Sequence, residues 1–216
     1  MEKLLVSCGT LSSGGAERVL SVLSCSFADA FQEVTYITWI DMPDFYQLDP
    51  RVKRICIEKE CGSKSIFKKA LWFRRYVKRE KISLVLSFLE PFNIMICAIL
   101  FGIKVPIIVS DRNDPRVVWN SFCQKNIRKT AYCKASGIVC QTEHNKCYYK
   151  GSLLRKAKVI MNPVFMPDDY VGKALRANKE NRIVAVVRLD IQKNLQMLIK
   201  AFDLFHRQHQ EYSLTI

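Results

Sequence analysis

Glycine-rich and polar stretches follow several short apolar segments of this sequence, at the points where those segments end. The first stretch, Gly9–Arg18, contains the adjacent glycines Gly14 and Gly15. Adjacent glycines let a backbone approach a ligand closely, and the free N–H groups at the start of a following helix favour an anion. This stretch predicts a phosphate-binding turn, although a plain tight turn fits the glycines equally well. Its spacing lacks the G-x-G-x-x-G of a dinucleotide site, which argues against a dehydrogenase.

A second polar stretch, Ser110–Pro115, comes directly after the apolar segment 105–109. Asp111, Arg112 and Asn113 offer a carboxylate, a guanidinium and an amide, which are groups that bind sugar hydroxyls or phosphate. The same residues fit an Asn/Asp helix cap with proline at the first helical position. The two interpretations are compatible.

Thr142, Glu143 and His144 form a third polar stretch, after the apolar segment 137–140. Taken alone, His144 fits an exposed residue at a helix start better than a catalytic base. No residue of the chain is identified as catalytic at this level.

A fourth polar turn, Arg188–Asn194, lies near the end of the sequence. Arg188 and Lys193 place two cations around a predicted helix N-terminus, an arrangement suited to a diphosphate. From spacing alone, a solvated charged turn is the better interpretation.

A parallel sheet would bring these stretches to one edge, and the pattern of the chain predicts such a sheet. Short apolar segments alternate with amphipathic helical patterns, which is typical of a parallel sheet covered on both faces. We predict an α/β fold with one Rossmann-like domain and an incomplete second one. The predicted strands are 4–8, 34–39, 52–57, 84–88, 105–110, 137–140, 158–160, 183–187 and 213–216. The predicted helices are 16–31, 65–81, 91–101, 115–133, 142–150 and 195–208.

The alternation lapses after Asn162 and Pro163, where proline, glycine, aspartate and charged residues gather. We therefore predict a first domain at 1–165, a linker or hinge at 166–182 and the start of a second domain at 183–216.

Composition restricts the compartment and the partners. The 216 residues include 34 Lys and Arg against 20 Asp and Glu, a net charge of +14. This surplus favours anionic partners such as phosphorylated ligands, an acidic membrane surface or nucleic acid. Nine cysteines without a C-x-x-C pair indicate reduced, mostly buried thiols in the cytosol. The most apolar window, 92–109, is interrupted by glycine and lysine, so we predict no transmembrane helix.

The segment 64–81 combines eight cations with apolar residues at helical spacing. A basic amphipathic helix of this kind binds an anionic bilayer or a polyprenyl diphosphate. The alternative is a sheet-covering helix with a solvated basic face. A nucleic-acid-binding module is a rival from another class, but no RNA- or DNA-binding signature appears. The cations predicted to contact the membrane are Lys68, Lys69, Arg74, Arg75, Lys78 and Arg79.

Four segments, in order, resemble the retaining glycosyltransferases of GT-B fold that are called family 4. They are Gly14–Arg18, Ser110–Pro115, Val159–Val164 and Arg188–Asn194. The resemblance implies an N-terminal acceptor domain and a C-terminal donor domain of Rossmann type. It also implies metal-independent hexosyl transfer from a nucleotide-sugar to a lipid-linked or capsular glycan. The donor, expected to be a UDP-sugar, would be held at its diphosphate by Arg188, Lys193, Gly14 and Gly15.

The acceptor side follows from the same resemblance. Its candidate residues are Asp111, Arg112, Asn113, Thr142, Glu143 and His144. The expected acceptor is a glycan or a polyprenyl-diphosphate-linked glycan, bound at the cytoplasmic face of the cell membrane, with no metal, other cofactor or nucleic acid. Val187 replaces the glycine usual before the family's arginine, and the later Glu-x7-Glu region is absent. We therefore expect this chain to be inactive alone. A non-catalytic, membrane-associated subunit that is completed by a second chain is the alternative.

Overall fold

A computed structural model describes residues 2–118, 121–164 and 180–216. The chain divides into two compact units, Met1–Pro163 and Val164–Ile216. Residues 166–179 of the predicted linker lie outside the described residues, so the linker remains a prediction.

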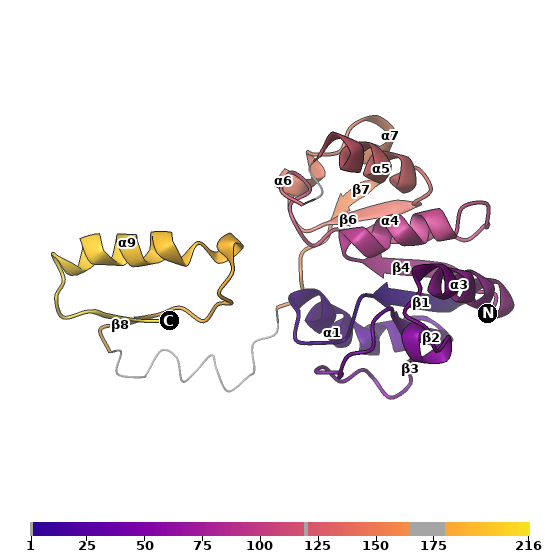
Figure 1. The fold of residues 1–216 in the computed structure, drawn as a ribbon, viewed down its shortest axis with the longest axis horizontal. Coiled ribbons are helices and arrows are strands. Elements are labelled where there is room, and N and C mark those ends of the chain that lie inside the picture. The colour runs from indigo at the N-terminus through magenta and orange to yellow at the C-terminus, as the bar shows by residue number, and fades with distance from the viewer. Residues whose placement is uncertain (1, 119–120, 165–179) are drawn as a thin grey trace. The chain divides into compact units, whose positions relative to one another are not determined.

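The first unit contains a seven-stranded parallel sheet in the order β3-β2-β1-β4-β5-β6-β7 (Figure 1). The first three strands are placed in the order β3-β2-β1. After β3 the chain crosses to the other side of β1, where β4 pairs with β1, and β5, β6 and β7 then extend the sheet in that direction. The strands are β1 Lys3–Cys8, β2 Glu33–Thr38, β3 Lys53–Cys56, β4 Leu84–Phe88, β5 Ile107–Ser110, β6 Gly137–Cys140 and β7 Ala157–Val159.

Helices cover both faces of this sheet. Successive side chains of a strand point to opposite faces, and the strands carry apolar side chains on both, so each face packs against helices. Leu5 of β1 packs in a core with the helices that follow β3, β4, β5 and β6, whereas its neighbours Leu4 and Val6 pack against the first helix. The helices are α1 Gly15–Ala30, α2 Ile57–Glu60, α3 Ile66–Arg79, α4 Glu90–Ile99, α5 Phe122–Tyr132, α6 Glu143–Lys146 and α7 Gly151–Lys156. This arrangement confirms the predicted α/β class with a Rossmann-like parallel sheet.

Two predicted helices differ from the observed ones. The helix expected from Pro115 begins only at Phe122, where Ser121 and Gln124 form a reciprocal capping box. Residues 115–118 make a turn instead, in which the Val117 and Val118 N–H groups donate to the Asp114 carbonyl. The helix expected at 142–150 is shortened to α6, and a separate helix α7 begins at Gly151, which has a positive φ of 56°.

The prediction of mostly buried thiols is wrong. All nine cysteines are free, but only Cys8, Cys97 and Cys140 are buried. The four exposed thiols lie on outward helix faces or at helix ends, where an apolar neighbour in sequence does not imply burial. They are Cys25, Cys123, Cys133 and Cys147.

The described part of the second unit, 180–216, contains two parallel strands, β8 Arg182–Val184 and β9 Ser213–Thr215, and the helix α9 Leu195–His206 (Figure 1). A short 3₁₀ turn, Ile191–Lys193, precedes α9. No residue of α9 is buried. Within the described parts of both units, no helix is long and apolar enough to cross a membrane.

Candidate functional site

The polar stretches of the first unit meet at one edge of the sheet. Phe88 at the end of β4 pairs with Ser110 at the end of β5, and Ser110 pairs with Val139 of β6. Because these strands are parallel, the residues that follow them emerge on the same side. The glycine stretch after Cys8 of β1 emerges at this edge as well, since β1 pairs in parallel with β4.

The glycine stretch forms an open start for α1. Gly14 is the N-cap in extended conformation, and the first turn of the helix leaves N–H groups without intrahelical partners. A Cβ on Gly15 would meet no atom within 4 Å, so the backbone here is accessible to a ligand. A Cβ on Gly14 would lie 2.1 Å from Oε2 of Glu17, which explains the glycine at this position.

Glu17 is buried behind the same turn. Its Oε1 accepts a hydrogen bond of 3.0 Å from Thr10 Oγ1, and the Thr10 and Ser12 hydroxyls are 2.9 Å apart. Glu17 thus fixes the conformation of the loop while its carboxylate offers negative charge close to the helix start. An incoming phosphate would have to approach through the N–H groups on the side of Gly15.

Arg112 belongs to the loop after β5 and is half-buried. Its guanidinium carbon is 3.9 Å from the centroid of the Phe88 ring, and the side chain donates a hydrogen bond to Asn162 Oδ1. Burial lowers the pKa of Arg112 to about 10, and the charge of Asp111 opposes that shift. Its Nε is buried without a hydrogen-bond partner among the described residues. Arg112 is therefore a cation at the sheet edge with capacity for a further acceptor.

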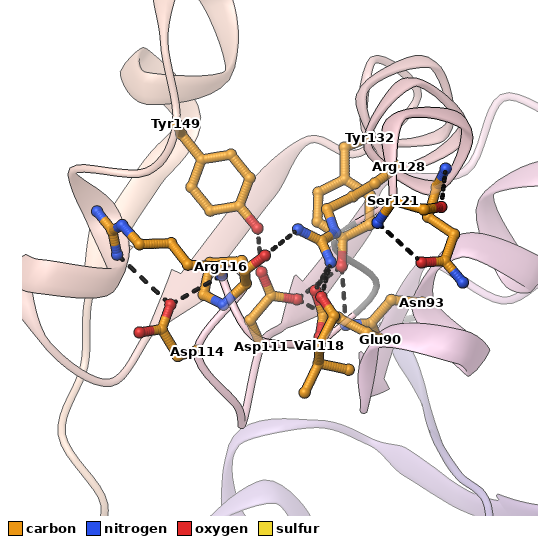
Figure 2. A network of polar contacts seen from close by, with 12 residues as sticks. Glu90, Asn93, Asp111, Asp114, Arg116, Val118, Ser121, Arg128, Tyr132 and Tyr149 are labelled. Atoms are coloured by element: carbon orange, nitrogen blue, oxygen red, sulfur yellow. Dashed lines mark hydrogen bonds and ion pairs between the residues drawn. The ribbon is translucent and has the colours of Figure 1, made fainter.

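Asp111 is fully buried and holds the loop in place (Figure 2). Tyr132 donates a 2.6 Å hydrogen bond to its Oδ1, Tyr149 donates to its Oδ2, and the Asn93 amide donates to Oδ1 at 3.2 Å. Burial raises the pKa of the Asp111 carboxyl, and the two tyrosine hydrogen bonds partly offset the rise. These contacts connect α4, α5 and the loop before α7 to one carboxylate.

A second buried carboxylate lies at the start of α4. Glu90 Oε1 is 2.6 Å from Arg128 Nη2, and Arg128 also donates to the backbone carbonyls of Pro115 and Val118 (Figure 2). Burial, followed by the charge of Asp111, raises the pKa of Glu90 to about 7. The strand-to-helix turn before it is tight, with Leu89 at a φ of 73°.

The remaining acceptor candidates lie on the exposed side of this network. Asp114 Oδ1 accepts from the Arg116 backbone N–H at 2.9 Å, and its Oδ2 is 3.5 Å from His144 Nε2. Thr142 caps α6, and Glu143 and His144 form its exposed first turn. His144 is an exposed helix-start residue, as its context in the sequence favoured. Asn113 is half-buried at the same edge.

The basic helix α3 covers the sheet and also presents cations to solvent. Phe73, Tyr76 and Val77 are in the core. Three of the six cations predicted to contact a membrane are engaged within the protein. Lys69 Nζ is 2.7 Å from Glu58 and 2.8 Å from the Trp39 carbonyl, and Arg74 donates to the carbonyls of Ile99 and Phe101. Arg79 is exposed, but its Nε is 2.8 Å from Glu80 Oε1. The exposed cations are Lys68, Arg75, Lys78 and Arg79.

Arg188 and Lys193 belong to the second unit. Both side chains are exposed, and Lys193 ends the 3₁₀ turn just before α9, whose N-cap Asn194 is left-handed at a φ of 46°. The sequence therefore placed Lys193 correctly at a helix start. Among residues 2–118, 121–164 and 180–216, no group of three or more His, Cys, Asp or Glu side chains is arranged to hold a metal ion.

Sequence reasoning did not select the buried residues that support this edge of the sheet. Glu90 carried a signal, because a Glu-Pro pair directly after a strand marks a helix start. Arg128, Tyr132 and Tyr149 carried none, since each lies in a helical or loop segment far from the residues it contacts.

Comparison with known proteins gives two related sequences. The chain is 28% identical over 219 residues to a GalNAc-alpha-(1->4)-GalNAc-alpha-(1->3)-diNAcBac-PP-undecaprenol alpha-1,4-N-acetyl-D-galactosaminyltransferase of Campylobacter jejuni, covering 98% of this chain and 59% of that protein. It is 26% identical over 216 residues to the amylovoran biosynthesis glycosyltransferase AmsD of Erwinia amylovora, covering 96% of this chain and 60% of that protein. The chain thus spans about three fifths of the length of either relative. No family model matches the sequence.

Solved structures share the fold. The crystal structure of Anabaena Alr3699/HepE in complex with UDP and glucose superposes with a TM-score of 0.69 at 15% identity, over 94% of this chain and 58% of that one. At this identity the similarity establishes the fold alone.

Proposed function

We propose that this chain is the acceptor-side part of a retaining, family 4 type glycosyltransferase that transfers a hexosyl group from a nucleotide-sugar to a lipid-linked or capsular glycan. The observation that supports this most is similarity along almost the entire chain to two proteins named as glycosyltransferases. One name specifies a PP-undecaprenol-linked glycan and the other amylovoran biosynthesis, so both concern growing glycans.

The donor in this proposal is a UDP-sugar bound through its diphosphate. The open backbone at Gly15, next to the N-cap Gly14, suits a phosphate oxygen, and Arg188 and Lys193 supply positive charge in the second unit. During transfer the acceptor hydroxyl oxygen bonds to the anomeric carbon as the bond from that carbon to the diphosphate breaks. The nucleoside diphosphate leaves with the electron pair, and the hydroxyl proton passes to it. Cations and helix N-termini stabilise the charge that develops on the leaving group, so the proposed reaction is metal-independent.

The acceptor in this proposal lies along the loops after β5 and β6. Arg112, with a buried and unsatisfied Nε, and the half-buried Asn113 are its principal contacts, and Thr142, Glu143 and His144 border them. Asp111 takes a positioning role, because its carboxylate is fully buried and bonded to three side chains.

A membrane surface holds the acceptor in this proposal. The exposed cations of α3 would contact anionic lipids on the cytoplasmic face of the cell membrane, as a peripheral attachment. A donor-side region would complete the enzyme, either as a further part of the same protein or as a second chain, and the 216 residues alone would be inactive.

A transfer assay tests the proposal. A protein of the relatives' length, or this chain with a candidate second chain, is incubated with UDP-glucose, UDP-galactose and their N-acetyl forms, and with polyprenyl-diphosphate-linked glycans. We expect transfer from at least one donor, with the anomeric configuration of the donor retained in the product as measured by NMR. Unchanged activity after treatment with a chelator is expected for a metal-independent reaction. The absence of both hydrolysis and transfer with every one of these donors would overturn the proposal.

A further inference from the structure

Two open hollows adjoin at the ends of β2 and β3, away from the loops after β5 and β6. One has a volume of about 560 Å³ and is lined by residues 41–44, 54–56, 59 and 60. The other, about 460 Å³, is lined by residues 44–50, 52 and 54 together with Leu11 of the glycine stretch. Asp44 and Arg54 line both hollows and form the wall between them. Together the hollows have the size of a small polar ligand site.

The side chains of Asp44 and Arg54, which separate the two hollows, hold each other in place through hydrogen bonds. Arg54 binds Asp44 in a bidentate manner, with Nε to Oδ2 at 3.1 Å and Nη2 to Oδ1 at 2.9 Å, and its Nη1 donates to the Ile55 carbonyl. Both side chains remain partly exposed, so the carboxylate oxygens retain lone pairs for further donors. A planar carboxylate–guanidinium pair held in this way can accept from one sugar hydroxyl and donate to the next.

An exposed aromatic ring stands beside this pair. Phe45 is 67% exposed although its ring packs edge-on against Tyr46 at a centroid distance of 5.0 Å. Core packing therefore does not account for a phenylalanine here. The face of an aromatic ring carries negative charge density that attracts the C–H groups of a pyranose ring. A flat apolar ring next to paired polar groups matches the two sides of a sugar.

The charges of the first hollow favour a neutral ligand over an anion. Asp41, Asp44 and Glu60 line it against only Arg54 and Lys59, which is three acids minus two bases, a net charge of −1. Both bases are already paired, Arg54 with Asp44 and Lys59 with Asp41 at 3.0 Å. A phosphate would find no uncommitted cation there, even though the chain as a whole is strongly basic.

Backbone contacts attach this region to the glycine stretch. The Trp39 and Ile40 N–H groups donate to the Gly9 carbonyl at 3.0 and 3.1 Å, and the Phe45 N–H donates to the Leu11 carbonyl at 2.9 Å. A sugar in the hollows would thus lie beside the loop that leads to Gly14. We propose that Asp44, Phe45 and Arg54 form a subsite for one neutral hexose unit of the acceptor glycan. This rests on the proposed function only for the identity of the ligand as acceptor.

Titrations followed by amide NMR of the ¹⁵N-labelled chain test the subsite. The probes are the methyl α-glycosides of glucose, galactose, N-acetylglucosamine and N-acetylgalactosamine. We expect saturable shifts at the amides of Asp44, Phe45 and Ile55 for at least one glycoside, with a dissociation constant on the order of 1–10 mM. Phe45→Ala should weaken binding at least about tenfold, and Phe45→Tyr, which keeps the ring, should restore it. Phe101→Ala is the matched control, because Phe101 is an exposed phenylalanine on another element.

Each outcome separates the subsite from the wider function. No saturable shift with any glycoside, shifts that survive Phe45→Ala, or the same shifts with inorganic phosphate would overturn the subsite. A UDP titration and the transfer assay are read independently. If glycosides shift the Phe45 amide but no donor is used, the subsite is supported and the proposed transferase function is refuted. If transfer occurs but Phe45→Ala changes neither glycoside binding nor the KM for the acceptor, the subsite is refuted and the transferase function stands.

Discussion

Glu90 and Arg128 form an ion pair of 2.6 Å in which each side chain is 1% exposed. The pair joins the start of α4 to α5, and Arg128 also binds the carbonyls of Pro115 and Val118. Arg128 therefore fixes the end of the polar loop that contains Asp111 and Arg112, at Pro115. Loop geometry at this edge of the sheet depends on a contact between residues 38 positions apart in the sequence.

We predict that Arg128→Met destabilises the first unit strongly. Removing one partner leaves a buried carboxylate and two buried carbonyls without their donor, which costs about 3–5 kcal/mol. Urea denaturation followed by the fluorescence of buried Trp39 measures the free energy of unfolding. Lys59→Met, which breaks the exposed pair with Asp41, is the control and should leave the free energy of unfolding nearly unchanged, because exposed ion pairs contribute little to stability. A loss below 1 kcal/mol in Arg128→Met would show that the buried pair contributes little to stability.

The raised pKa of Glu90 predicts a pH dependence of stability. The folded state binds the Glu90 proton up to about pH 7, whereas a glutamate carboxyl in the unfolded chain releases it near its ordinary pKa of 4.5. Between these values the folded state holds more protons, so the free energy of unfolding falls as pH rises from about 4.5 to about 7. The expected fall from this group is on the order of 1–3 kcal/mol.

Glu90→Gln tests that dependence. The amide does not titrate, so the slope between pH 5 and pH 7 should flatten in the variant relative to the original protein. Glu143→Gln, at an exposed position of α6, should leave the slope unchanged. An identical slope in Glu90→Gln and the original protein would assign the pH dependence to other groups.

The sheet and most strands could be predicted from the sequence because apolar periodicity is a local property. The predicted bounds 84–88 and 137–140 are those of β4 and β6, and most other predicted strands differ from the observed ones by one or two residues. The start of α5 was missed although a local signal existed. Ser121 and Gln124 have the spacing of a capping box, which outweighs the Pro115 signal earlier in the chain.

The support of the candidate site could not be predicted, because it is made by contacts between distant residues. Asp111 was selected as a ligand contact from its place after a strand, but Tyr132 and Tyr149 reach it from 21 and 38 positions away. Lys69 was counted among exposed cations because helical spacing does not reveal that Glu58 and the Trp39 carbonyl enclose it. Glycine and charge patterns locate a site edge, whereas burial of its polar groups requires the fold.

We predict that the chain binds anionic liposomes and that binding weakens steeply with salt. Simultaneous charge reversal at Lys68, Arg75 and Arg79 should abolish it, because each cation near the surface contributes about 1 kcal/mol. Flotation with vesicles containing an anionic phospholipid measures the bound fraction. The matched control reverses two exposed cations of α5, Lys125 and Lys129, together with the nearby Lys150, and should retain at least part of the binding. Equal binding by the α3 variant and the original chain would remove α3 as the membrane contact.

We predict that Lys193→Ala weakens use of the nucleotide-sugar donor when this chain is completed by a donor-side region, as in the transfer assay above. A hydrogen bond to a charged phosphate contributes about 1.5–3 kcal/mol, so kcat/KM for the nucleotide-sugar should fall roughly tenfold to a hundredfold. Lys200→Ala is the control, because Lys200 is an exposed lysine of α9 that lies beyond the helix start. Wild-type kinetics in Lys193→Ala would show that the diphosphate is held elsewhere.

Amide hydrogen exchange should divide the 216-residue chain at its two units. In the first unit, strands of the seven-stranded sheet carry buried side chains of one continuous core, so their amides should exchange slowly. These residues include Leu5, Ile37, Val85 and Ile107. Residues 182–216 supply two three-residue strands and one helix without a buried residue, and a segment of that size rarely folds unaided. The apolar residues of α9 are Leu195, Met197, Leu198, Ile199, Phe202, Leu204 and Phe205.

We therefore expect fast exchange throughout β8, α9 and β9 in a dilute monomer. Several of these apolar side chains are exposed, including Met197 and Leu204, and exposed apolar surface promotes association. Protection of α9 should accordingly appear only at higher protein concentration or with added donor-side sequence, and mass spectrometry of peptides from 195–206 at two concentrations measures this. Slow exchange in α9 at the lowest concentration, equal to that of β1, would contradict the prediction and show that the second unit is stable in the isolated chain.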